Sequence, residues 1–118
     1  MMALPRSYTG AWYAWRHAFL PTAALRDGRG RAAVYGVVLD LDHMRSTIYS
    51  LGLAVESGPP FDFEARAADN LAELQTNEAA LDGLALETAE RVPLDAFIAA
   101  TRAVLRELAR LNVSPPAV

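Results

Sequence analysis

The sequence contains no cysteine and no lysine among its 118 residues. The absence of cysteine excludes disulfides, thiolate zinc sites and thiol catalysis. The absence of lysine excludes Schiff-base chemistry, a lysine general base and the phosphate-binding lysine of a P-loop. The two histidines, His17 and His43, lie on separate segments, and neither belongs to a Glu-x-x-His pair. We therefore expect no metal and no cofactor, and we assign no catalytic residue.

Long hydrophobic runs are also missing, because no segment has the roughly 18 continuous apolar residues that a membrane span requires. The aromatic stretch near the N-terminus is interrupted by Arg16 and His17 and lacks the basic beginning of a signal peptide. We expect a cytoplasmic protein that makes no membrane contacts. All eleven basic side chains other than histidine are arginine, and alanine occurs 23 times. This bias indicates GC-rich, bacterial coding.

Apolar residues make up 53% of the chain and charged residues 21%, which suits a single folded domain with one core. The apolar positions recur in steps of three and four, the spacing of amphipathic helices. We predict an all-α fold, a compact up-down-up-down bundle of about four helices. The expected helices cover residues 7–19, 31–52, 62–91 and 93–111, and residues 112–118 form a flexible tail. Continuity of the third helix through Gly83 is left open. Ser7 is the expected first cap, and Pro93 is expected to open the last helix.

The segment VVLDLDHM at residues 37–44 resembles the first motif of haloacid-dehalogenase phosphatases. The resemblance implies a strand that ends in a nucleophilic Asp40 and an acid/base Asp42. The threonine that this family has two residues later is Met44 here, and the family's downstream lysine is absent. The apolar spacing around the segment is helical, and on a helix these two carboxylates point roughly 200° apart. We therefore interpret the pair as carboxylates on a solvated helix face.

The segment HMRSTIYSLG, which begins at His43, is similar to the H-box helix of histidine kinases. The similarity implies a phosphoryl acceptor at His43, with Arg45 and Ser46 near the phosphate. The acidic residue that follows the histidine in that family is missing, and the later spacing is one residue short. Phosphotransfer through His43 is thus one hypothesis, and an exposed histidine without a special role is the simpler one.

Charge is distributed unevenly along the chain. Residues 1–31 carry five arginines against Asp27, a net charge of +4, and residues 32–118 carry six arginines against thirteen acids, −7. A basic region with aromatic residues predicts stacking on nucleic acid, with Arg26, Arg29 and Arg31 as the contacts. The acidic total of −3 opposes phosphate binding. A nucleic-acid-binding regulator is accordingly the second functional hypothesis.

The stretch from residue 8 to residue 15 holds two tryptophans and two tyrosines, more aromatic surface than one face of a short helix can bury. Tryptophan and tyrosine are enriched in protein interfaces. We therefore predict a small non-enzymatic interaction module, a regulatory, adaptor or assembly protein. Its expected partner is a second copy of the chain or a larger protein. The predicted contacts are Trp12, Tyr13, Trp15, Arg16 and Phe19.

Overall fold

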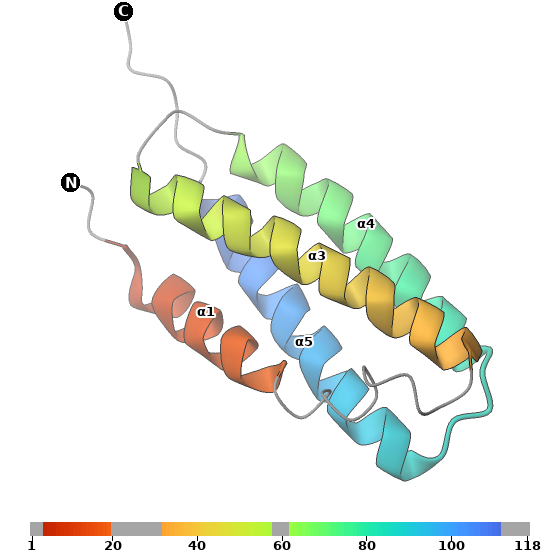
Figure 1. Ribbon diagram of the computed structural model, residues 1–118. Coiled ribbons are helices and arrows are strands. Elements are labelled where there is room, and N and C mark those ends of the chain that lie inside the picture. The colour runs from red at the N-terminus through yellow and green to blue at the C-terminus, as the bar shows by residue number, and fades with distance from the viewer. Residues whose placement is uncertain (1–3, 20–31, 58–61, 112–118) are drawn as a thin grey trace, which may run out of the picture.

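The computed structural model describes residues 4–19, 32–57 and 62–111, and these residues form helices and no strands (Figure 1). The predicted all-α, four-helix bundle is confirmed. The helices are α1 (Arg6–Ala18), α3 (Ala32–Ser57), α4 (Phe63–Asp82) and α5 (Thr88–Arg110).

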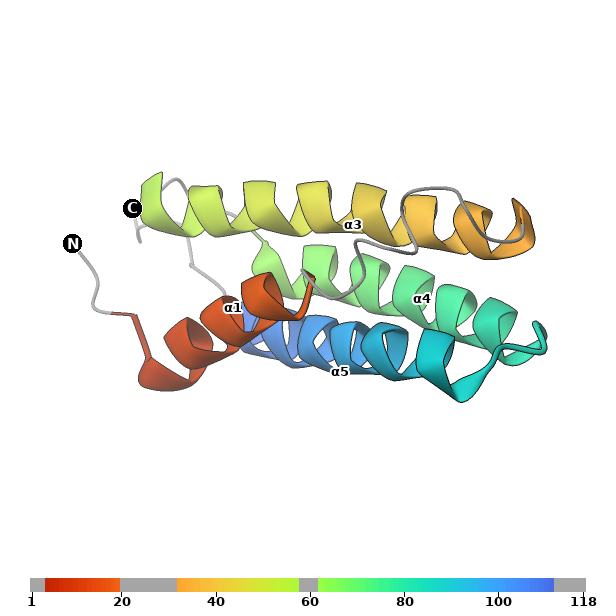
Figure 2. The same ribbon diagram turned by 60° about the horizontal axis from the view of Figure 1, so that its bottom comes forward.

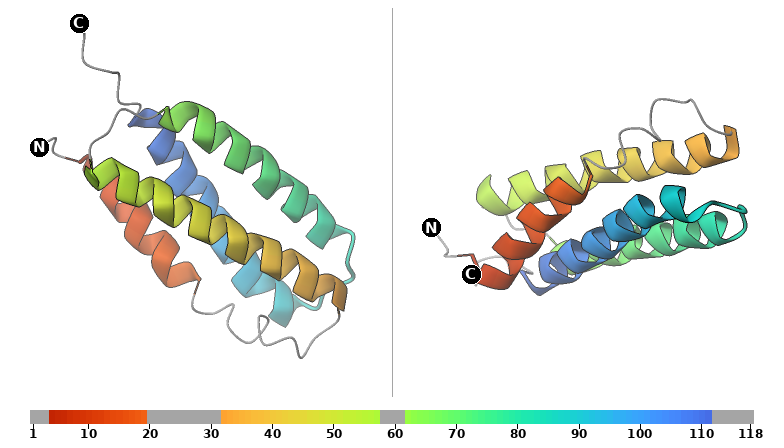
Figure 3. Two further views of the ribbon diagram at one scale, coloured as in Figure 1. Left: turned by 45° about the horizontal axis from the view of Figure 1, so that its top comes forward. Right: turned by 90° about the horizontal axis from the view of Figure 1, so that it is seen from below.

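Neighbouring helices along this order run in opposite directions, as the up-down-up-down prediction requires (Figure 1). The helix α5 packs closely on both α1 and α4, and α3 lies along the opposite side of the bundle, against α4 (Figure 2). The helix α1 has 13 residues and α3 has 26, so α1 covers only part of the length of α3 (Figure 3). Within the described residues, the other helices pack on one side of α3 only.

The core is built from one apolar stripe on each helix. On α3 the buried side chains recur at helical spacing, at Val38, Leu41, Met44, Ile48 and Leu51. The stripe of α5 is denser and is buried along the whole helix, at Leu94, Phe97, Ile98, Val104, Leu105 and Leu108. Burial of each such side chain contributes about 1.5–3 kcal/mol relative to leaving it in water.

The boundary between α4 and α5 differs from the predicted one. The helix α4 ends at Asp82 with Gly83 as its C-cap, and residues 88–91 belong to α5 and not to α4. A capping box starts α5, because the carboxylate of Glu87 accepts from the backbone of Glu90 and the Glu90 side chain accepts from the Glu87 N–H at 3.2 Å. Pro93 therefore lies inside α5 and does not open it, and burial of the α5 stripe offsets the backbone hydrogen bond that proline removes.

Two other helix ends also differ from the sequence-based expectation. The helix α1 begins at Arg6 with Pro5 as its N-cap and has no side-chain cap, so Ser7 lies in the first turn. The hydroxyl of Thr9 donates to the Pro5 carbonyl instead, at 3.3 Å. The helix α3 continues past Gly52 to Ser57, because a single glycine costs only about 1 kcal/mol in a helix that is otherwise well packed.

Gly52 is the residue of α3 that lies directly against Trp12, one of the two tryptophans of α1. A β-carbon at this position would overlap the Trp12 indole, lying 2.8 Å from Cζ2 and nearer still to Cη2 and Cζ3. The Trp12 ring has little freedom to move aside, since it contacts the rings of Trp15 and Tyr49 with centroid distances of 5.1 and 5.8 Å. The missing side chain of Gly52 is therefore a structural requirement of the α1–α3 contact.

We predict that Gly52→Ala lowers the free energy of unfolding by about 1–3 kcal/mol, because overpacking outweighs the gain in helix propensity. Chemical denaturation followed by circular dichroism measures the change. Gly10→Ala is the matched control, since nothing lies within 4 Å of a β-carbon there. It should raise stability by about 0.5–1 kcal/mol. An equal gain in both variants would contradict the role of Gly52.

Candidate functional site

The five residues predicted as partner contacts divide between the interior and the surface. Trp15 is only 1% exposed and belongs to the core, and Trp12 and Phe19 are half-buried against it. Tyr13, in contrast, is 57% exposed, and Arg16 is also exposed. Most of the aromatic surface of α1 is thus used for packing inside the chain, which leaves Tyr13 and Arg16 on the outside.

The aromatic rings form two groups of contacts between α1 and its neighbours. Trp12 stands at the centre of the first group and contacts Tyr8 as well as the two rings already named, with a centroid distance of 6.1 Å. At the other end of α1, the Phe19 ring packs on Phe97 of α5 at 5.4 Å. Burial and the nearby Glu56 carboxylate raise the pKa of Tyr8 to about 12. Tyr8 at the start of α1 thus lies close to Glu56 at the end of α3.

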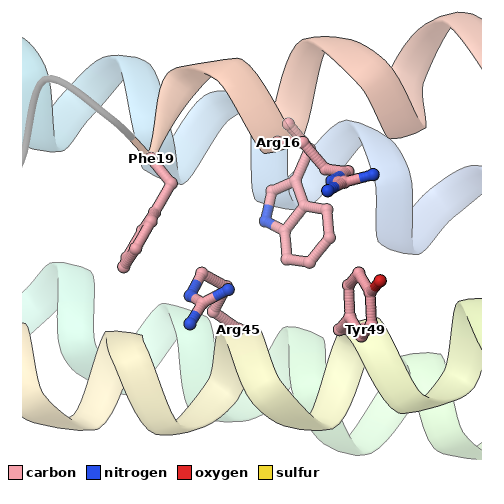
Figure 4. Close-up of a pocket in the computed structure, with 5 residues that line it drawn as sticks. Arg16, Phe19, Arg45 and Tyr49 are labelled. Carbon is pink, nitrogen blue, oxygen red and sulfur yellow. The ribbon is translucent and has the colours of Figure 1, made fainter.

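A cavity of about 190 Å³ opens between α1 and α3. Figure 4 shows Arg16 of α1 and Phe19, the residue that caps α1, facing Arg45 and Tyr49 of α3 across it, and Trp15 completes the lining. Each guanidinium lies over an aromatic ring of the opposite helix. Arg45 is 4.3 Å from the Phe19 centroid and Arg16 is 5.5 Å from the Tyr49 centroid, within the range of cation–π attraction.

The polar groups around this cavity are incompletely paired. The Arg45 Nε donates to Asp42 Oδ1 at 3.2 Å. Arg16 has no hydrogen bond or ion pair to any residue that the structure describes. The Trp15 Nε1 is buried and likewise lacks an acceptor in the described part of the chain. A second groove, between α4 and α5, differs in this respect, because its Arg102 is paired with Glu78 at 2.9 Å.

The outer face of α3 is a feature that the sequence prediction missed. Five exposed residues share this face at helical spacing and carry no carboxylate and no guanidinium, and the exposed Glu56 of α3 is not one of them: Leu39, His43, Ser46, Ser50 and Leu53. Leu39 is 48% exposed and Leu53 is 50% exposed. A solvent-facing helix surface normally carries charged residues. The sequence contains the pattern that could have predicted this face. Residues 39, 46 and 53 are seven apart, and α3 has only four acidic or arginine residues.

The two aspartates of the phosphatase-like segment lie on α3 and have separate structural partners. The Asp40 Oδ2 accepts from the Asn77 amide of α4 at 2.5 Å, whereas Asp42 is the partner of Arg45. This arrangement agrees with the helical interpretation of the segment. No group of three or more potential metal ligands occurs within residues 4–19, 32–57 and 62–111.

His43 is exposed on α3, on the side that the H-box similarity requires. It lies beside an acidic pair that joins α3 to α4. Burial raises the pKa of Glu73, the neighbouring Asp40 carboxylate raises it further, and His43 acts in the opposite direction. Negative charge this close to His43 opposes the approach of a phosphoryl donor, and phosphotransfer through His43 stays a prediction.

The arginines predicted to contact nucleic acid, Arg26, Arg29 and Arg31, lie outside the described residues. Among the helices that the structure describes, none has the length and hydropathy needed to cross a membrane. Comparisons with protein-family models, with curated proteins and with solved structures found no match to this chain. The functional inference therefore depends on the geometry of the α1–α3 side alone.

We predict that Glu73→Gln raises stability at pH 7, because it removes a carboxylate whose ionisation the folded state opposes. The gain should be complete above the raised pKa of Glu73, shrink as the pH falls through it, and vanish below the ordinary pKa of glutamate. We expect less than about 1 kcal/mol, since solvent screens an exposed charge.

Denaturation of both proteins across pH 3–8 measures this difference, with Glu64→Gln as the control. Glu64 lies in the first turn of α4, where the helix dipole favours its charge, so its removal should give no gain. A gain from Glu73→Gln that does not depend on pH would contradict the electrostatic cause.

Proposed function

We propose that this protein is a small protein–protein interaction module that assembles with a second copy through the outer face of α3. The observation that carries the proposal is the uncharged stripe Leu39, His43, Ser46, Ser50 and Leu53, which the other helices leave open. Two half-exposed leucines on a helix face without carboxylate or guanidinium groups favour contact with another protein surface. In this chain the described helices cover α3 on one side only.

The charged side chains of α3 flank the stripe without entering it. Asp40 lies on the side toward α4, where it accepts from Asn77. Asp42 and Arg45 lie on the side toward α1 and pair with each other. This pattern, an uncharged centre with polar edges, is typical of the buried core and polar rim of a protein interface.

The spacing of the stripe suits a two-fold symmetric pair. Leu39 and Leu53 are each seven residues from Ser46. If two α3 helices cross antiparallel on an axis at Ser46, Leu39 of one copy lies opposite the partner subunit's Leu53, and the reverse contact forms at the same time. This is the isologous arrangement of a two-fold dimer. The small side chains of Ser46 and Ser50 let the two helices approach closely at the centre.

The sequence predicted that α1 contacts the partner, whereas in this proposal α1 stabilises the bundle and α3 contacts the partner. Trp15 and its ring neighbours hold α1 on the bundle and so fix the position of α3. Tyr13 and Arg16 are the members of the predicted contact set that remain accessible. Their direct contact with a partner, and a regulatory or adaptor role, stay predictions.

We predict that the protein elutes with about twice its chain mass of 12.8 kDa in size-exclusion chromatography with light scattering. The double variant Leu39→Glu, Leu53→Glu should shift the mass toward that of one chain, because it places like charges opposite each other across the contact. Its circular dichroism should remain helical, since both side chains are about half exposed.

Val92→Glu is the matched control, because Val92 is 61% exposed but lies on α5. This variant should keep the dimer mass. A wild-type mass of one chain at all concentrations would contradict the proposal, and so would equal loss of the dimer in the control.

Absorbance at 260 and 280 nm on the same column tests the nucleic-acid hypothesis, which co-eluting nucleic acid would favour.

A further inference from the structure

We infer that the cavity between α1 and α3 is a binding site for a small aromatic monocarboxylate. The inference is independent of the proposed assembly, because the cavity residues and the uncharged stripe lie on different sides of α3. It depends on three observations: the cavity size, the incompletely paired cations, and the buried indole N–H of Trp15.

The cavity size limits the ligand to about the dimensions of a benzene ring with one substituent. Its volume is about 190 Å³, and a protein cavity of about 150 Å³ accommodates benzene. Aromatic rings form its walls at Trp15, Phe19 and Tyr49. A flat apolar ligand can stack on such walls, which favours an aromatic body over a strongly hydrated one.

The charge of the lining favours a monoanion. Arg16 and Arg45 contribute two positive charges, and Asp42 neutralises part of the second. The bond to Asp42 uses only Nε of Arg45, so its terminal amino groups have no other partner among the described residues. A planar guanidinium fork of this kind binds a carboxylate through two parallel hydrogen bonds.

The Trp15 indole adds a neutral donor at the same place. Trp15 is 1% exposed, and its Nε1 has no acceptor in the described structure. A buried N–H without a partner is unfavourable, because it has given up water without replacing it. Trp15 lines the cavity, so a bound carboxylate oxygen would supply the missing acceptor once a small turn of the indole brings Nε1 to the cavity wall. Two guanidinium groups and one indole thus belong to the lining of the same cavity.

The test is a titration with benzoate, and proton–nitrogen NMR of the two tryptophan indole N–H groups is the readout. The signal that disappears in the variant Trp12→Phe belongs to Trp12, and the other belongs to Trp15. We expect the Trp15 signal to shift and saturate with a dissociation constant of about 10 mM or lower, the range expected for nine non-hydrogen atoms. Benzyl alcohol, which has a similar shape but no charge, should shift it much less. Inorganic phosphate, which lacks the aromatic body, should also bind more weakly.

Arg16→Gln and Arg45→Gln should each weaken benzoate binding by about tenfold, the loss expected for a charged hydrogen bond. Arg106→Gln is the matched control, an exposed arginine on α5 in the other groove, and it should bind as the wild type does. Circular dichroism confirms that each variant is folded.

Three results would overturn the inference. The first is the absence of any Trp15 shift up to about 10 mM benzoate. The second is binding of benzyl alcohol or of phosphate with the same affinity as benzoate. Equal binding of benzyl alcohol would mean that the carboxylate is not recognised, and equal binding of phosphate would mean that the aromatic ring is not recognised. The third is unchanged benzoate affinity in both arginine variants.

Discussion

The packing of the Trp12 indole on Gly52 is the contact on which the rest of the α1–α3 side depends. A side chain at residue 52 would overlap the ring, and the ring is held by its aromatic neighbours. This contact brings the short helix α1 against α3 at one end, while Phe19 packs on Phe97 of α5 at the other. Large rings thereby set the separation between α1 and α3.

The two functional features of the molecule are consequences of this arrangement. The cavity lies between Trp15, Phe19, Tyr49 and the two arginines. Both guanidinium groups lie over rings, and Arg45 is also paired with Asp42. Among the described residues, the outer face of α3 is exposed because the other helices pack on its opposite side. An uncharged helix surface in that position supports the proposal of self-assembly, and the polar groups of the cavity support that of ligand binding.

The fold could be predicted from the sequence because each helix carries an apolar stripe at helical spacing, most clearly from Leu94 to Leu108. The start of α5 could not be predicted, because the capping box at Glu87 and Glu90 depends on side-chain geometry. Proline is common at the first position of a helix, so Pro93 indicated a later start. The site was predicted only in part. Aromatic content indicated that α1 makes important contacts, but it did not show that Trp15 faces inward. The cavity was not predictable, because Arg16 and Arg45 come from different helices and meet only in the folded chain.

The most direct test of self-assembly through α3 uses the absence of cysteine, because a single introduced cysteine reports on one position. Under mild oxidation, Ser46→Cys should form a disulfide-linked dimer rapidly, since the proposed two-fold axis passes through residue 46 and a disulfide requires Cα atoms within about 7 Å. Leu39→Cys alone should not do so, but it should cross-link to Leu53→Cys when the two are mixed. If Ser46→Cys cross-links no faster than Val92→Cys on α5, the chain does not pair through this face.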